Sequence, residues 1–374
     1  MSGGVDGFVD FMQNKVKIVR SARSSLLLSY VIGVVIFIES SITALIAGAV
    51  GRPFCNKYKI PNAKLAFVCD STSAPISSLI ILNGWGALLL GLVSTQVAQG
   101  VVNIDAIELL IDAVFYNFYA ISALMVTFLA IWFNIDIGAM KRSKYRASQN
   151  QEVELKPQSM YYMILPILLM VFFVFVYLFI TGDGNILKGS GSSAIFYTVL
   201  TTLIFTLFYY VYTKNMTLKT WSLTTLSGAK KLFPIAMILL FAFAIGEVTS
   251  ELKTGEYLAS LASQNLSIYL LASVIFLLSA LISFSTGTSW GTFSIMIPIA
   301  MPMAVGMDAN VALVIGAVIS GGIFGDHCSP ISDTTIISSM ASDCEVVEHV
   351  QTQLPYALIS GIIALFMFLL FSLS

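Results

Sequence analysis

The chain has 374 residues, of which 57% are hydrophobic and only 10% are charged. Soluble domains carry about 25% charged residues, so this composition excludes an ordinary soluble protein. The net charge of −1 gives no indication of a nucleic-acid or acidic partner, and we expect no nucleic acid. Several apolar segments reach the roughly 20 residues that span a bilayer. The four cysteines show no metal-ligand spacing. We therefore expect an all-α polytopic membrane protein with about nine membrane elements and no cofactor.

The first membrane element, Leu26–Val50, carries Glu39 near its middle. Basic residues stand on both sides of it, among them Arg23 before and Arg52 after. Because Lys and Arg favour the cytoplasmic side of a membrane, both flanks are predicted to be cytoplasmic. A 25-residue element cannot cross a bilayer twice. We therefore predict a re-entrant hairpin with its tip near Glu39–Thr43.

Two further elements precede a basic linker. Leu65–Val97 is interrupted by the run Asp70–Pro75, whereas Ala113–Phe133 is an unbroken apolar stretch. Proline removes a backbone donor and breaks a helix. Non-helical backbone at membrane depth is tolerated only where protein or a water-filled cavity covers it, so the break at Pro75 is expected to line a site. The linker 136–157 is rich in Lys and Arg and is predicted, like the N-terminus, to be cytoplasmic.

The middle of the chain, residues 158–265, is interpreted as a set of connecting scaffold helices. Its apolar spans are Met160–Ile180, Ile195–Tyr212 and Leu232–Val248.

The C-terminal part, residues 266–374, repeats the order hairpin, broken helix, helix that residues 1–135 show. Both broken elements carry serines around a proline, Pro75 in the first and Pro330 in the second. The positions of Lys and Arg give the two copies opposite orientations, and inverted pairs of broken helices are typical of secondary transporters. The second copy consists of Ile268–Val305 with a predicted tip at Thr286–Ser289, then Asn310–Met340, then Pro355–Leu373.

Two aspartates lie inside the apolar segment Asn310–Met340. A charged group at the centre of a membrane costs about 2.5–3.5 kcal/mol on insertion scales, so such a cluster indicates a function. A buried carboxylate can hold a proton or, once deprotonated, a cation. Competition between Na⁺ and H⁺ for one site is sufficient for antiport. The expected ion- and proton-binding residues are Asp326, Asp333, His327, Asp70 and Glu39.

Oxygen ligands are expected around these groups. Carbonyls freed at helix breaks, together with Ser and Thr hydroxyls, suit hard cations rather than soft metals. The breaks are predicted at Pro75, Gly287 and Pro330, and a Na⁺ ion is expected at Asp326, Asp333 and Thr288. The predicted substrate shell comprises Ser71, Thr72, Asn83, Thr286, Thr288, Ser289, Ser329, Ser332 and Thr334.

Structural roles for the same residues stay open. Asp333 and Asp70 could cap the helices beyond them, and Glu39 could be a solvated interfacial charge. His327 could be a hydrogen-bonded partner of Asp326 that never titrates. The charged residues before the last helix are expected in a solvated loop: Asp343, Glu345, Glu348 and His349.

Three runs of the chain resemble NhaC-type Na⁺/H⁺ antiporters of the ion transporter superfamily. They are Gly325-Asp326-His327-Cys328-Ser329-Pro330-Ile331-Ser332-Asp333-Thr334-Thr335 with the following His349–Tyr356, Thr286–Thr292, and Asp70–Pro75. The resemblance implies exchange of Na⁺ for H⁺ by alternating access in the plasma membrane. Some relatives exchange malate for lactate, so an organic-acid substrate stays open. The family often has two acidic residues where this chain has Ile38-Glu39-Ser40.

Other interpretations belong to different classes. The start at Ser2-Gly3-Gly4 lies well inside typical family chains, so the chain could be an N-terminally shortened, inactive member or a non-transporting partner. An intramembrane aspartyl protease would also use two aspartates, but the spacing around Asp326 is wrong, and we expect no enzyme. The expected partners are Na⁺, H⁺ and the lipid bilayer, with a homodimer as the expected assembly.

Overall fold

The computed structural model describes residues 19–37, 39–146, 158–184, 191–252 and 267–373, together with Gly3, Gly4, Gly7, Phe11 and Tyr257. The regular elements among these residues are all helices. The expected linker residues 147–157 lie outside the described residues, as do 185–190 and most of 253–266 in the predicted scaffold. Most of the N-terminus expected to be cytoplasmic lies outside them too.

Six helices of the described residues are long and apolar enough to cross a membrane, and seven if one bent pair is counted as a single span. This confirms the all-α polytopic class. The predicted count of nine membrane elements stays a prediction; among the described residues, α2 and the apolar part of α10 are each shorter than 18 residues.

The chain divides into two compact units, Met1–Ile18 with Ser148–Leu240, and Val19–Ala147 with Phe241–Ser374. In the first unit, α9 (Tyr161–Thr181) packs against α10 (Gly191–Tyr212). The Tyr177 hydroxyl lies 2.6 Å from Thr201 Oγ1, and the Tyr210 hydroxyl donates to the carbonyl of Tyr162. The long helix α11 (Leu218–Glu251) begins in this unit.

The second unit opens with the predicted hairpin, built from α2 (Ala22–Val35) and α3 (Ser40–Tyr58). The two helices pack on each other, and the Tyr58 hydroxyl donates to the carbonyl of Val19, so both ends of the hairpin lie together. The chain turns between Val35 and Ser40, so only Glu39 of the predicted tip Glu39–Thr43 lies in the turn; that the hairpin is re-entrant stays a prediction. Glu39 is the N-cap of α3, and its carboxylate accepts from the backbone N–H groups of Ser41 and Ile42.

Both broken helices are found at their prolines. The first consists of α4 (Asn62–Ser71), α5 (Ala74–Leu79) and α6 (Gly84–Ala98), with a bend of 43° before α6. The second consists of α15 (Val311–Cys328) and α16 (Asp333–Ser342). Pro75 lies in the first turn of α5, just after the turn at Thr72 and Ser73, whereas Pro330 lies between α15 and α16 with Ser329 and Ser332 beside it.

The second hairpin, α13 (Ile268–Thr286) and α14 (Ser289–Gly306), turns at Gly287. Gly287 adopts φ +67°, a left-handed conformation that favours glycine. A side chain there would lie 2.9 Å from the carbonyl oxygen of Ile331, because the tip packs directly on the break between α15 and α16. The remaining helices are α7 (Ala106–Phe115), α8 (Phe118–Trp132), the short 3₁₀ helix η1 (Gly138–Arg142) and α17 (Val346–Phe371).

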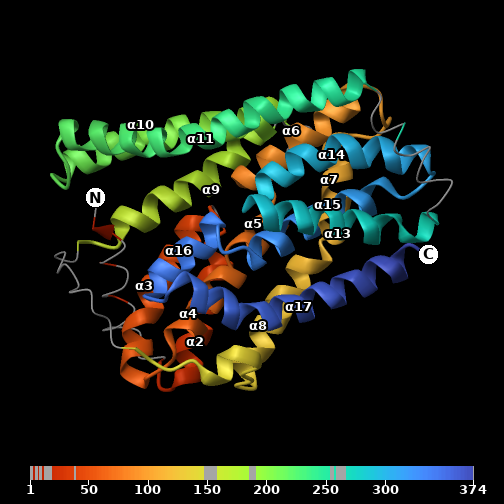
Figure 1. The fold of residues 1–374 in the computed structure, drawn as a ribbon. Coiled ribbons are helices and arrows are strands. Elements are labelled where there is room, and N and C mark those ends of the chain that lie inside the picture. Colours follow the sequence, from red (N-terminus) through yellow and green to blue (C-terminus); the bar gives the residue numbers. More distant parts are fainter. Residues whose placement is uncertain are drawn as a thin grey trace. The chain divides into compact units, whose positions relative to one another are not determined.

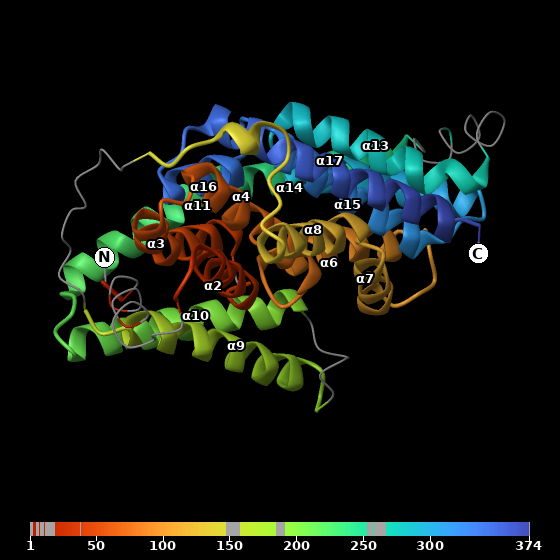
Figure 2. The same cartoon turned by 90° about the horizontal axis from the view of Figure 1, so that it is seen from below.

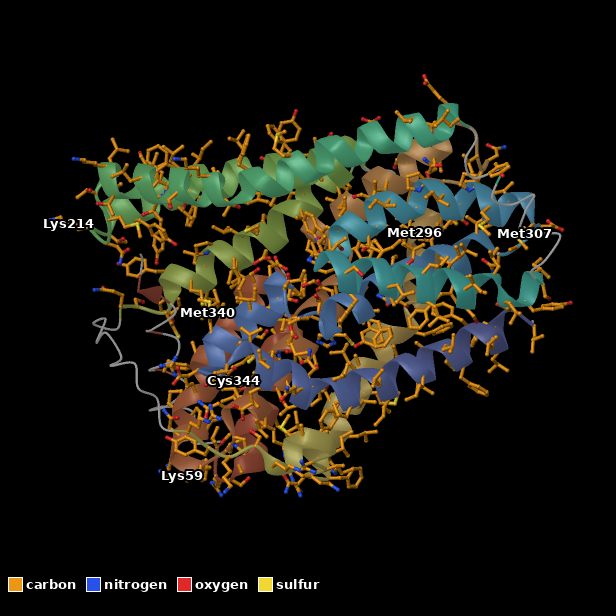
Figure 3. The ribbon with its side chains drawn as sticks, viewed as in Figure 1. Lys59, Lys214, Met296, Met307, Met340 and Cys344 are labelled. Carbon is orange, nitrogen blue, oxygen red and sulfur yellow. The ribbon has the colours of Figure 1, made fainter. Side chains whose placement is uncertain are left out.

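The two hairpins of this unit open toward opposite ends. Lys59 and Cys344 lie at the end where the first hairpin opens, and Met307, after α14, lies at the other (Figure 3). α13 and α14 flank α15, whose span is 89% buried (Figures 1 and 2).

Equivalent helices of the two halves make equivalent contacts with the other half. α3 packs on α16 while α14 packs on α6, and α4 packs on α17 while α15 packs on α8. This pattern supports two inverted repeats in residues 1–135 and 266–374, a division that stays a prediction.

Candidate functional site

A buried carboxylate, Asp70, stands at the C-terminal end of α4 and is fully shielded from solvent. Two side chains of α17 reach it. Gln353 donates from Nε2 at 2.7 Å and His349 Nε2 lies at 3.2 Å, both against Oδ2 of Asp70. Two hydroxyls of α16 add to this shell, Thr335 at 3.4 Å from Oδ2 and Ser338 at 3.3 Å from Oδ1. We call Asp70 and these four donors the Asp70 cluster.

The orientation of the donors follows from their partners. The same Nε2 of Gln353 also donates to the carbonyl of His327 at 2.7 Å. Because both partners are pure acceptors, the amide nitrogen has to face them. Tyr119 has its hydroxyl 2.9 Å from His327 Nδ1. With the hydroxyl as donor, Nε2 of His327 carries the ring proton and faces Oδ2 of Asp70 at 3.7 Å.

The Asp70 cluster therefore favours a permanently charged carboxylate. Four hydrogen-bond donors and a further imidazole surround two oxygens, and donors to a charged group are the stronger kind. Protonating Asp70 would leave some of these buried donors without an acceptor, which is costly.

Asp326 has a different environment. It lies near the C-terminal end of α15, is only 2% exposed, and its Oδ2 accepts from the Thr334 hydroxyl at 3.2 Å. The Ser332 and Thr334 hydroxyls lie 3.0 Å apart beside it. Its other oxygen, Oδ1, is buried without a hydrogen-bond partner among the described residues. Unlike Asp70, this carboxylate has a free oxygen at a helix break.

Asp333 and Glu39 stand at two neighbouring helix N-termini. Asp333 is the first residue of α16, is exposed on the protein surface, and bonds the N–H of Thr334 at 2.9 Å. Glu39 caps α3. A side chain at Gly48 would touch Ala341, and each of these two lies eight residues after the first residue of its helix. Glu39 and Asp333 are also close enough to interact electrostatically, so α3 and α16 run parallel and the two carboxylates lie at the same depth.

His327 is placed against Asp70 and Tyr119, and no described hydrogen bond joins its ring to Asp326, the partner expected from the sequence. Thr288 caps α14 by accepting from Gly291, and Asn83 caps α6 while donating to Phe37 and Ser77. These two are held by local structure, so Asp326 and Thr334 form the better-defined part of the expected Na⁺ site.

The other predicted shell residues bond to the backbone or line a void. Ser71 is buried beside His327, Thr72 donates to Val68, Thr286 to Ile282, Ser289 to Gly322 and Ser329 to Phe284. In the part of the chain that the structure describes, no group of three or more His, Cys, Asp or Glu side chains could hold a metal ion.

The sequence reasoning was wrong for His349, which was expected in a solvated loop. α17 begins at Val346, and His349 is fully buried on the face toward α4. Glu348 points the other way and bonds Ser143 of the linker. Gln353 and Tyr119 were missed as site residues. A helical wheel of 346–353 would have separated His349 and Gln353, four residues apart on one face, from Glu348.

The profile of the Na⁺/H⁺ antiporter family matches residues 83–373. The chain belongs to the Na⁺/H⁺ antiporter family. An uncharacterized protein of Haemophilus influenzae is 33% identical over 96% of this chain and 72% of its own length. An uncharacterized Na⁺/H⁺ antiporter of the same organism is 40% identical over 28% of the chain and 22% of its own length. The malate-2H⁺/Na⁺-lactate antiporter of Bacillus subtilis is 36% identical over 27% of the chain and 21% of its own length.

Membership of the Na⁺/H⁺ antiporter family, with several membrane-length helices, makes this chain a multi-pass transport protein and points away from an enzyme.

Proposed function

We propose that the chain exchanges Na⁺ for H⁺ across the plasma membrane by alternating access, with Asp326 as the carboxylate that both ions share. The observation that carries the proposal is the free Oδ1 of Asp326, buried beside the break between α15 and α16. A buried carboxylate with an unpartnered oxygen needs either a proton or a cation. The NhaC subtype, a cytoplasmic N-terminus and linker, and a homodimer stay part of this proposal.

The ligand chemistry near Asp326 favours a hard cation. The hydroxyls of Thr334 and Ser332 lie beside its carboxylate, and the break at Pro330 leaves backbone carbonyls outside any helix. Oxygen donors of this kind suit Na⁺. Asp333 and Glu39 add negative charge at the neighbouring helix starts, which attracts a cation toward the site.

An organic-acid substrate is the alternative, supported by the malate-2H⁺/Na⁺-lactate antiporter among the relatives. A carboxylate substrate needs a cationic partner. The two buried histidines of the site, His327 and His349, already face Asp70. The buried Lys64 is paired with Asp136 at 2.7 Å. The charges of the described residues therefore favour a cation.

The test is proton flux in vesicles that hold the purified protein, started by adding Na⁺ or malate. We expect Na⁺-driven flux in the wild type, loss of at least tenfold in Asp326→Asn, and no loss in the control Asp308→Asn. Asp308 is exposed at a left-handed turn that Asn also tolerates. Full exchange in Asp326→Asn would remove that residue from the mechanism, and flux with malate alone would favour the alternative.

A further inference from the structure

A narrow void lies beside the Asp70 cluster, between α4, α8 and α17. Its walls include Phe67 and Ser71 of α4, Thr127 of α8, His327 of α15, and Gln353 and Tyr356 of α17. It is too narrow to admit a water molecule in this conformation.

Three of the side chains that line this void carry buried polar atoms without a hydrogen-bond partner among the described residues. They are Thr127 Oγ1, His327 Nε2 and Gln353 Oε1. Each of these residues is at most 2% exposed. Buried polar groups are nearly always hydrogen-bonded to protein or to ordered water, and a water molecule typically satisfies two to four of them. Once the void widens, these three atoms would offer hydrogen bonds to water that enters it.

Two of the side chains that line the void are stacked rings. Phe67 and Tyr356 lie with ring centroids 4.4 Å apart and an angle of 27° between their planes. The Tyr356 hydroxyl donates to the carbonyl of Ile135 and accepts from the N–H of Ile137, both at 3.0 Å. The chain after α8 thus holds the Tyr356 ring in place.

Ion pairs hold both ends of the stretch 136–146 against the helices. Lys64 Nζ lies 2.7 Å from Asp136, next to the tyrosine contacts. Arg146 pairs with Glu345 and Glu348 at the start of α17. Gly138 lies so close to Pro355 that a side chain there would overlap its ring.

We propose that this void opens into a route by which water, and with it protons, reaches the buried polar groups around His327, the residue that follows Asp326, from the side of residues 135–146, with the Phe67–Tyr356 stack as its gate. The route deepens the proposed function, since proton exchange requires solvent contact from each side. The stack keeps the route shut in this conformation. Movement of residues 135–146 releases Tyr356 and opens it.

The experiment measures solvent access directly, so its outcome does not depend on whether the chain exchanges Na⁺. The four cysteines are replaced by alanine, and Ala123→Cys is introduced in the wall of the void. The rate of reaction with a small, charged methanethiosulfonate reagent is measured in vesicles of both orientations. We expect Phe67→Ala to accelerate labelling at least tenfold, and only from the linker side.

Tyr356→Phe keeps the ring and removes both bonds to the linker, so a smaller acceleration from the same side is expected. If Phe67→Ala does not fold, Tyr356→Phe alone tests whether the stack closes the route. The matched control is Phe368→Ala. Phe368 lies on α17, twelve residues beyond Tyr356 and about 18 Å along the helix. It is buried against Phe118 of α8. Equal acceleration in Phe368→Ala, or unchanged labelling in both gate variants, would overturn the route. If gate variants accelerate labelling while the wild type shows no Na⁺-driven flux, the route stands and the proposed exchange fails.

Discussion

His349 Nε2 lies 3.2 Å from Oδ2 of Asp70, although 279 residues separate the two along the chain. The contact joins a helix of the first half to the last helix of the protein. It also places a histidine and a carboxylate in a region shielded from solvent. Together with the bond from Gln353, it makes Asp70 the point where α4, α15, α16 and α17 meet.

Asp70 and Asp326 should respond differently to the same substitution. Asp70→Asn puts an amide among four donors, so breaking this buried network should lower the free energy of unfolding by roughly 3 kcal/mol or more. Asp326→Asn should cost about 1 kcal/mol or less, because an Asn carbonyl can still accept from Thr334. Apparent melting temperature and monodisperse yield in detergent measure both. Equal loss in the two variants would contradict the distinction between a fixed and an exchanging carboxylate.

Gln353→Leu should destabilise the protein by about 2–3 kcal/mol. The substitution removes two hydrogen bonds, one of them to a charged group, and leaves Asp70 less well paired. Gln351→Leu is the control, since Gln351 is exposed on the same helix. Thermal unfolding of the two variants side by side provides the comparison. A loss of the same size at Gln351 would mean that the effect belongs to the helix surface and not to the Asp70 cluster.

The sequence located the breaks of the fold better than the contacts of the site. Pro75, Pro330 and Gly287 act on the backbone at their own positions, through a missing donor or a left-handed turn, so each could be read locally. The Asp70–His349 contact depends on how α4 and α17 pack, and no local spacing encodes it. The acidic residues near His349 also suggested a solvated loop, because charges on one face of a helix obscure a buried face opposite.

Gly287→Ala should impair both stability and exchange. An alanine at φ +67° costs about 1–2 kcal/mol, and its Cβ would also press on Ile331 at the helix break. Gly100→Ala is the matched control, because Gly100 has φ +77° and open space around it. The difference between the two melting temperatures measures the contact alone. We expect Gly287→Ala to cost about 1–3 kcal/mol more than Gly100→Ala; equal costs would show that the hairpin tip does not bear on the break.

Two of the ion pairs of the linker, Lys64–Asp136 and Arg146–Glu345, should contribute unequally. The Lys64 side chain is 6% exposed and Asp136, 34% exposed, lies 2.7 Å away, whereas Arg146 and Glu345 are 62% and 75% exposed. Removing one partner of a buried pair costs several kcal/mol, but Lys64 keeps its bond to Asn134, so Asp136→Asn should cost about 1–3 kcal/mol. Glu345→Gln should cost at most about 1 kcal/mol. Thermal unfolding at low and high salt checks this, and a larger loss for Glu345→Gln would reverse the ranking.

The single amide of Gln353 has a consequence for how the molecule can move. By bonding Asp70 of α4 and the backbone of α15 at once, it fastens three helices into one rigid frame. Moving α17 away from α4 would leave the buried Oδ2 of Asp70 without its hydrogen bond from Gln353. Among the described contacts neither hairpin donates to Asp70, so under the proposed alternating access we expect the movements that expose the ion to each side to come from α2–α3 and α13–α14.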